Sequence, residues 1–190
     1  MTATVFVNRI EEAVVNVTIG SGPGTFPRAG FVPAGGVLRQ RMNAGTIEAV
    51  GLELAGERRW ERLRLSAAAS ATDARMNGGD AAPQLTGLRP AQAPIWSAVV
   101  AADWITTDRL TLSLDARWES RRFEDDLNSR ALEAGLTLDA RAEWRVVERV
   151  GLWLALDNLA DARIPVSETA NGVEGFGPPR SVRAGLRLTF

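Results

Sequence analysis

The chain has 190 residues, of which 45% are hydrophobic and 24% charged, a composition typical of one folded domain or of part of a larger one. It contains no Cys, His, Tyr or Lys, so all 22 basic side chains are Arg, which excludes disulfides, thiol nucleophiles, His-dependent triads and Cys or His metal sites. The net charge of −1 argues against a nucleic-acid-binding protein, which normally carries a basic surface.

Neither a signal peptide nor a transmembrane helix is expected from the sequence. Met1–Val7 lacks the charged and apolar regions of a signal peptide. No run of apolar residues approaches the roughly 18 that a spanning helix requires. On these features alone the chain would be assigned to the cytoplasm, but the pattern of its strands indicates another location.

Apolar and polar residues alternate with a period of two along most of the chain, which predicts β-strands. Eight strands are expected, over residues 3–17, 37–55, 63–72, 96–104, 110–119, 132–146, 150–156 and 181–190. For the first two strands, the sequence does not decide which residues face the apolar side of the sheet and which face the polar side. Glu48 and Glu53 lie on opposite parities, which predicts a bulge or a register change there. No segment has a convincing helical period.

The connections between these strands alternate strictly between short and long. Short turns are expected at 57–61, 106–109 and 147–150, and long Gly-, Pro- and Asn-rich loops at 20–36, 77–93, 125–130 and 165–179. The sequence therefore predicts an all-β fold: an antiparallel up-and-down meander of about eight long strands, with the turns on one rim and the loops on the other.

Two environments are compatible with such a sheet: a soluble, lipocalin-like barrel that binds a small apolar ligand inside, and an outer-membrane barrel with its apolar face in lipid. The predicted strands exceed the usual length of about 5–6 residues and match the roughly 9–11 of tilted membrane strands. Trp96, Trp104, Trp118 and Trp144 lie on the apolar parity near strand ends, as in interfacial aromatic belts. Together these features favour the membrane barrel.

Several motifs, in order along the chain, resemble those of one protein family, the TonB-dependent outer-membrane receptors. They are Phe6–Val17, Arg41–Gly45 with Gly51–Leu54, Leu88–Pro94, Asp157–Arg163, Gly177–Arg180 and Gly185–Phe190. The resemblance implies that residues 1–190 are the C-terminal part of the receptor barrel, without signal peptide, TonB box or plug domain. Without a plug the segment is not expected to transport alone. Because eight open strands would expose two unpaired edges to lipid, the isolated segment is expected either to close as a small barrel or to be unstable.

The same resemblance implies a location, a ligand and partners for the parent protein. The location is the outer membrane, in contact with lipid, and the ligand is a scarce nutrient such as a ferric siderophore. TonB would act only through the missing plug, and the barrel-assembly machinery would recognise the terminal aromatic residue, Phe190. Arg117, Glu119 and Arg121, on the polar parity approaching the loop rim, are the candidate ligand-facing residues.

Catalysis is not expected. Asp115, Glu119, Asp139 and Glu143 are inward carboxylates that acid–base chemistry would need, but Arg residues share their face, so a salt-bridged wall explains them more simply. Asn158 and Asp161 are expected to hold a turn or bulge at a strand end. No cofactor and no metal site are predicted.

Overall fold

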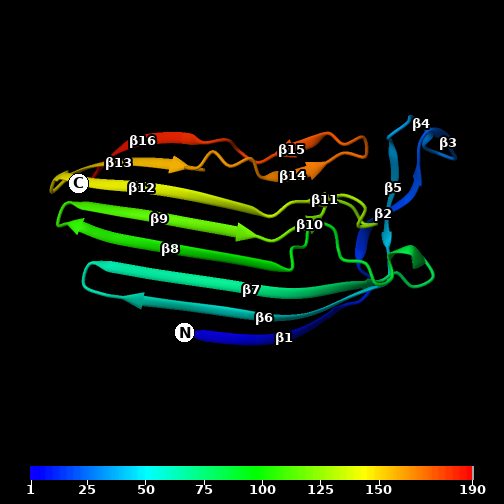
Figure 1. The fold of residues 1–190 in the computed structure, drawn as a ribbon, viewed down its shortest axis with the longest axis horizontal. Helices are drawn as coiled ribbons and strands as arrows, with labels where there is room; N and C mark the ends of the chain where they lie inside the picture. The colour runs from blue at the N-terminus through cyan, green and yellow to red at the C-terminus, as the bar shows by residue number, and fades with distance from the viewer. Residues whose placement is uncertain (190) are drawn as a thin grey trace.

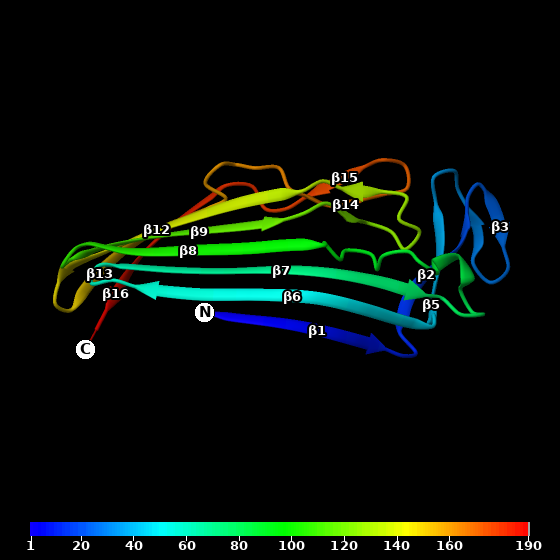
Figure 2. The same ribbon diagram turned by 60° about the horizontal axis from the view of Figure 1, so that its bottom comes forward.

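Eight long strands form one curved antiparallel sheet in this computed structural model, which describes residues 1–189 (Figures 1 and 2). Every strand pairs with the next long strand of the chain. In order across the sheet they are β1 (Thr2–Ile10), β6 (Thr46–Arg59), β7 (Leu63–Asn77), β8 (Trp96–Thr107), β9 (Leu110–Glu119), β12 (Gly135–Val147), β13 (Val150–Asp157) and β16 (Ser181–Leu188). The predicted all-β meander is confirmed.

The two ends of the sheet differ as the sequence predicts. The turn rim is the end formed by the tight connections at 60–62, 108–109 and 148–149, and the loop rim is the opposite end, formed by residues 11–45, 78–95, 120–134 and 158–180 (Figure 1). The loops contain short elements of their own: β2 (Val14–Ser21) paired with β5 (Val37–Asn43), β3 (Gly24–Phe26) with β4 (Gly30–Val32), β10 (Arg122–Phe123) with β11 (Ala131–Leu132), β14 (Pro165–Glu168) with β15 (Glu174–Phe176), and the 3-10 turn η1 (Pro83–Leu85).

The first two predicted strands are each broken in two. Between β1 and β2 the chain turns at Glu12, whose φ is 53°, and between β5 and β6 it turns at Gly45, whose φ is 75°. A Cβ on Gly45 would lie 1.9 Å from the carbonyl oxygen of Asn77, so this position requires glycine. The bulge predicted from Glu48 and Glu53 is wrong, because β6 pairs in continuous register through both residues. The break comes before them, at Gly45, and β2 and β5 leave the main sheet as a separate hairpin.

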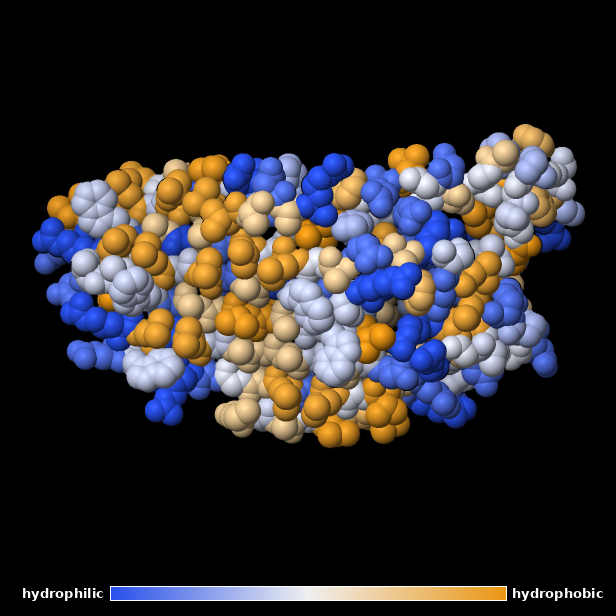
Figure 3. All heavy atoms as spheres, viewed as in Figure 1, coloured by the Kyte–Doolittle hydropathy of each residue, from blue (hydrophilic) through white to orange (hydrophobic). Residues whose placement is uncertain are grey.

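The strand register places the two residue parities on opposite faces of the sheet. Val5 of β1 lies opposite Leu52 of β6, which assigns the face that the sequence left open. On the same apolar face Leu136 is 46% and Trp144 50% exposed, and Figure 3 shows hydrophobic side chains spread across this side. The soluble-barrel alternative is not supported, since it would place these side chains in an interior core.

Four tryptophans lie near the ends of the apolar face, in two rows. Trp104 and Trp144 lie near the turn rim, whereas Trp96 and Trp118 lie near the loop rim. Trp96 and Trp104 are eight residues apart in β8, or about 26 Å along the strand. Two rows of amphipathic rings that bracket an apolar band are typical of a membrane-spanning barrel wall.

Trp153 differs from these four because it lies on the polar face. It is directly opposite Gly185 of β16, where an added Cβ would lie 2.6 Å from three atoms of the indole ring. The guanidinium of Arg141 lies 4.9 Å from the ring centroid. The indole is thus held between a cation and a strand that approaches it closely.

The sheet does not close on itself. Within residues 1–189, β1 pairs only with β6 and β16 only with β13, so each has one unpaired edge. The closed small barrel, one of the two expected outcomes for an isolated segment, is not the form observed. In the described part of the chain no helix is long and apolar enough to cross a bilayer.

Candidate functional site

The loops at the loop rim are packed together around a small hydrophobic core. Val17 of β2, Ala44, Met76 of β7, Ala82 and Leu85 of η1 are all at most 3% exposed and form one cluster. These residues come from the first two long loops and from the strand ends between them. The loops are therefore a folded layer on the sheet.

Buried polar groups tie the third loop to this core. Asp126, which is 6% exposed, accepts hydrogen bonds from the backbone N–H and the hydroxyl of Thr18 in β2, both at 2.6 Å. Asn128 accepts from the backbone N–H of Arg89 at 2.8 Å and donates to its carbonyl at 2.9 Å. These contacts satisfy groups that burial would otherwise penalise, and they connect the first three loops.

Asp125 holds the third loop in its own conformation. Its carboxylate accepts from the backbone N–H groups of Ser129, at 3.0 Å, and Arg130, at 2.8 Å, and from the Ser129 hydroxyl at 2.8 Å. Burial raises the pKa of Asp125, but the N–H and O–H donors and the nearby Arg130 guanidinium outweigh burial and lower the pKa below its usual value. The loop conformation therefore depends on an ionised carboxylate.

Two adjoining hollows, of about 420 and 610 Å³, lie among these loops and share Arg39 and Glu124. We call them the loop-rim groove. Its charged and amide side chains are Asn16, Arg39, Arg41, Gln92, Glu124, Asp126, Arg130 and Glu168.

The loop-rim groove contains three arginines and three carboxylates, so its formal net charge is zero (three minus three), but two of its arginines lack a partner among the described residues. Asp126 is engaged by Thr18, and Glu124 accepts a hydrogen bond from Gln92. Within residues 1–189, Arg39 and Arg41 have no side-chain hydrogen bond or ion pair. They are two residues apart in β5 and so lie on the same face of it. The groove thus offers two adjacent guanidinium groups to a ligand.

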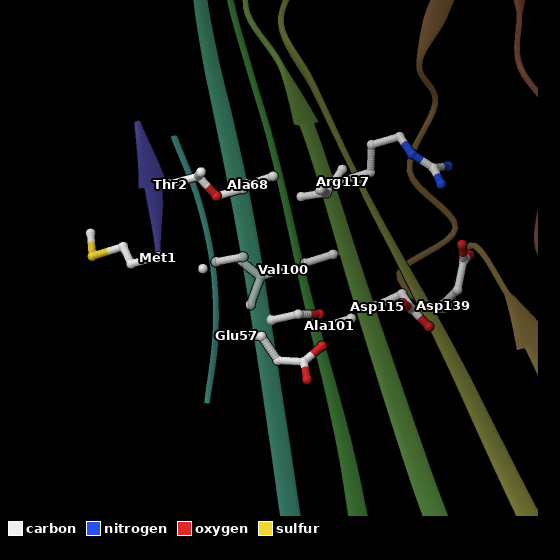
Figure 4. A pocket seen from close by; sticks show the side chains of 15 residues that line it. Met1, Thr2, Glu57, Ala68, Val100, Ala101, Asp115, Arg117 and Asp139 are labelled. Atoms are coloured by element: carbon white, nitrogen blue, oxygen red, sulfur yellow. The ribbon is translucent and has the colours of Figure 1, made fainter. Parts of the chain in front are cut away.

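The predicted ligand-facing residues lie at different heights of the polar wall. Arg117 lines a hollow of about 630 Å³ lower on the polar face, together with Asp115 and Asp139 (Figure 4). Glu119 ends β9 and lies 3.2 Å from a guanidinium nitrogen of Arg122. Arg121 lies beyond the strand, where it pairs loosely with Glu133 at 3.8 Å. Their contact with a ligand stays a prediction.

Arg122 is a loop-rim cation that the sequence analysis did not single out. Its side chain is 8% exposed, and it donates to Gln92 at 3.0 Å and to the carbonyl of Pro165 at 3.4 Å. It thereby joins the second and third loops to the fourth. No local pattern marks it, because these partners are 30 and 43 residues away in sequence.

The inward carboxylates have different neighbours on the polar face. Asp115 lies directly opposite Asp139, while Glu143 lies 2.7 Å from Arg141 and 3.5 Å from Arg187. Across residues 1–189 there is no group of three or more potential Asp, Glu, His or Cys ligands placed to hold a metal ion.

Asn158 and Asp161 hold the end of β13, as expected. Asn158 is 5% exposed; its side chain accepts from the N–H of Ala162 at 2.8 Å and donates to the carbonyls of Ala162 and Pro178. Asp161 accepts from the N–H of Arg180 at 3.0 Å. Both residues have positive φ, of 50° and 53°, so their role is to shape the turn.

A long-stranded meander with an exposed apolar face, two tryptophan rows and packed loops at one rim defines the class of this protein as part of a membrane-barrel wall. Residues 1–159 match the family described as TonB dependent receptor-like, beta-barrel. The chain belongs to this family, which is one of receptors and not of enzymes.

Solved structures of siderophore receptors share the fold. The siderophore receptor PiuA of Acinetobacter baumannii is 19% identical, with a TM-score of 0.73 over 97% of this chain. The ferric yersiniabactin uptake receptor FyuA of Yersinia pestis is 23% identical (TM-score 0.70, 80% covered), and the ferric-catecholate import receptor Fiu of E. coli K12 is 17% identical (TM-score 0.71, 99% covered). The chain spans 25% of the length of each of them. No curated protein sequence matches it.

Proposed function

We propose that residues 1–190 are the C-terminal segment of an outer-membrane receptor barrel that imports a ferric siderophore or a similar scarce nutrient with energy delivered through TonB. Membership of the family supports the receptor class. The siderophore and ferric-chelate receptors among the structural relatives support the ligand class.

The observation that carries the ligand assignment is the pair of unpartnered guanidinium groups in the loop-rim groove. Arg39 and Arg41 are placed to bind the negatively charged oxygen atoms of a ferric chelate, because guanidinium groups form strong charge-assisted hydrogen bonds with such oxygens. Glu119, Arg121 and Arg117 would line the wall below the groove, along the path of the ligand.

The segment acts only as part of a complete receptor. Its two open edges, at β1 and β16, would expose backbone groups that lipid cannot satisfy, so further strands must cover them. TonB engages such a receptor through a plug domain, which these 190 residues do not include. The apolar face would contact outer-membrane lipid. Phe190, which lies outside the described residues, would be recognised by the barrel-assembly machinery.

Binding of ferric chelates to the purified receptor tests this proposal. Ferric yersiniabactin and a ferric catecholate are titrated against the protein in detergent, with tryptophan fluorescence as the readout. The double variant Arg39→Gln/Arg41→Gln should bind at least about tenfold more weakly, and the loss should shrink at high salt. The matched control is Arg28→Gln/Arg163→Gln, two exposed loop cations outside the groove. Equal binding by the groove variant would disprove the site.

A further inference from the structure

The loop-rim groove contains acids that could neutralise its own arginines. Arg39 and Arg41 line one of its two hollows. Asp126 and Glu124 line the same hollow, and Glu124 also lines the second one. Each acid accepts hydrogen bonds from neutral donors instead: Asp126 from a backbone N–H and a hydroxyl of β2, and Glu124 from the side chain of Gln92. The two arginines stay free because neutral groups bind the acids beside them.

Among these acids, Glu124 is the one best placed to compete for the arginines. It lines both hollows, as Arg39 does, so the two side chains meet where the hollows adjoin. Asp126 is held by two hydrogen bonds of 2.6 Å, and Glu168 lines only the second hollow. Within residues 1–189, the carboxylate of Glu124 accepts a single hydrogen bond, from the amide of Gln92. That one contact therefore decides where its charge lies.

The orientation of the Gln92 amide is fixed by a buried cation. Its oxygen, Oε1, accepts from Nε of the buried Arg122 at 3.0 Å. Because a guanidinium group can only donate, the NH2 end of the amide must point away from Arg122. Nε2 accordingly donates to Glu124 and, at 3.4 Å, to the carbonyl of Val166. The backbone N–H of Gln92 is bonded too, to the carbonyl of Phe123 at 2.7 Å.

We propose that Gln92 is a positioning residue for ligand binding, which holds Glu124 away from Arg39 and Arg41 and so keeps both guanidinium groups available to an anionic chelate. Without the amide, the carboxylate of Glu124 turns across the groove and pairs with Arg39. An ion pair between exposed groups changes an equilibrium constant by up to about fivefold. A ligand that must displace Glu124 from Arg39 loses affinity by a similar factor.

The inference rests on the proposed function, because it concerns how the groove binds ferric chelates. It also makes a claim about the protein without ligand, namely that Glu124 pairs with Arg39 once the amide of Gln92 is lost. The rate at which phenylglyoxal modifies Arg39 tests that claim, since this reagent attacks free guanidinium groups. A receptor that binds no ferric chelate would disprove the proposed function and leave the modification experiment still decisive for Gln92.

Ferric-chelate titrations of the purified receptor compare Gln92→Met, Glu124→Gln and the double variant with the unaltered protein. Gln92→Met keeps the length of the side chain but removes the amide, so it should bind about threefold more weakly. Adding Glu124→Gln should restore the affinity. Glu124→Gln alone should bind at least as tightly as the unaltered protein, because it removes a competing negative charge. The matched control is Gln84→Met, at an exposed glutamine of the same loop that does not line the groove.

Modification of Arg39 by phenylglyoxal is followed by mass spectrometry in the absence of ligand, with the exposed Arg28 as internal reference. It should be about threefold slower in Gln92→Met and normal in the double variant. If Gln92 only supported the loops, Glu124→Gln would not rescue binding, since it does not replace the contact with Arg122. An absence of rescue therefore overturns the inference. So does weaker binding by Glu124→Gln alone, or unchanged modification of Arg39 in Gln92→Met.

Discussion

Single buried side chains decide how the loops of this protein are held. Asp125, Asp126 and Asn128 are close together in the third loop, but they bind different partners. Asp125 binds backbone groups of its own loop, Asp126 binds β2, and Asn128 binds the second loop. A hydrogen bond to a charged group contributes about 1.5–3 kcal/mol, so each of the two carboxylates stabilises the loops substantially.

Replacing Asp125 should loosen its loop without unfolding the sheet. In Asp125→Asn the carboxylate that accepts from Ser129 and Arg130 is lost, so their amide hydrogens should exchange about tenfold faster, as measured by hydrogen exchange. Glu133→Gln, an exposed acidic residue of the same loop, is the matched control. Unchanged protection in Asp125→Asn would show that the loop is held by other contacts.

The same carboxylate predicts a dependence on pH. The pKa of Asp125 in the folded loop lies below that in the opened loop, because the N–H donors and Arg130 stabilise the ionised form. Its contribution is therefore fully present above the ordinary Asp value of about 3.9 and is lost as the pH falls through the folded pKa. The amide hydrogen exchange rates of Ser129 and Arg130, corrected for intrinsic rates, should rise below about pH 4 in the unaltered protein. In Asp125→Asn, which has no carboxylate to protonate there, the rise should be smaller.

At the scale of the strands, side chains alternate because one face of the sheet contacts lipid and the other contacts water. Ala101 and Ala102 of β8 are chemically identical neighbours, but the register places Ala101 opposite Asp115 on the polar face and Ala102 opposite Leu114 on the apolar face. The two positions therefore form an internal comparison between water and lipid.

Arginine substitution at these two positions should have very different costs. Ala102→Arg should lower the free energy of unfolding in lipid by about 2 kcal/mol, as expected for a cation on the lipid face of a barrel strand. Ala101→Arg should cost much less, because the new cation faces Asp115 in the aqueous interior. Urea titrations of both variants in lipid vesicles measure the difference. Equal costs would contradict the assignment of the faces.

The strands could be predicted from the sequence because period-two alternation is a local property. The segment 110–119 matches β9 at both ends. The segment 132–146 begins three residues too early, because Leu132 keeps the alternation but belongs to β11, where it is 1% exposed beneath the loops. The alternation of apolar and polar residues identifies extended segments, but it does not show at which residue the chain leaves the main sheet.

The loop-rim groove could not be predicted in the same way. The contact between Thr18 and Asp126 joins residues 108 positions apart, and nothing near either one specifies the other. Extending the parity of β9 past Glu119 selected Arg121, but the strand ends there and the buried cation is Arg122. Beyond the end of a paired strand, the odd or even position of a residue no longer predicts which way its side chain points.

At the scale of the whole molecule, the open sheet requires partners for its edges. Strands β1 and β16 run antiparallel to each other, so closure between them is topologically allowed. An eight-stranded barrel, however, has an interior just wide enough to be filled by side chains. The match to a quarter of much longer receptors indicates instead a wall of a wide barrel.

Disulfide trapping in this cysteine-free sequence distinguishes the two arrangements. Val5→Cys/Leu52→Cys joins directly opposed residues of β1 and β6 and should cross-link under mild oxidation. Cysteine at Val5 combined with cysteine at Val182, Ala184 or Leu186 of β16 should not. A cross-link in any of these three pairs would demonstrate closure as an eight-stranded barrel.

The fit of Trp153 over Gly185 restricts how the last strand can be added to the sheet. A slip of β16 by one residue would turn its leucines toward water, which the apolar face forbids. A slip by two would keep both faces correct but would bring Arg183 or Arg187 beneath the indole, where the structure leaves no room for a Cβ. The indole of Trp153 therefore fixes the register of β16: of the pairings that keep its apolar side chains on the apolar face, only the observed one leaves room for the ring.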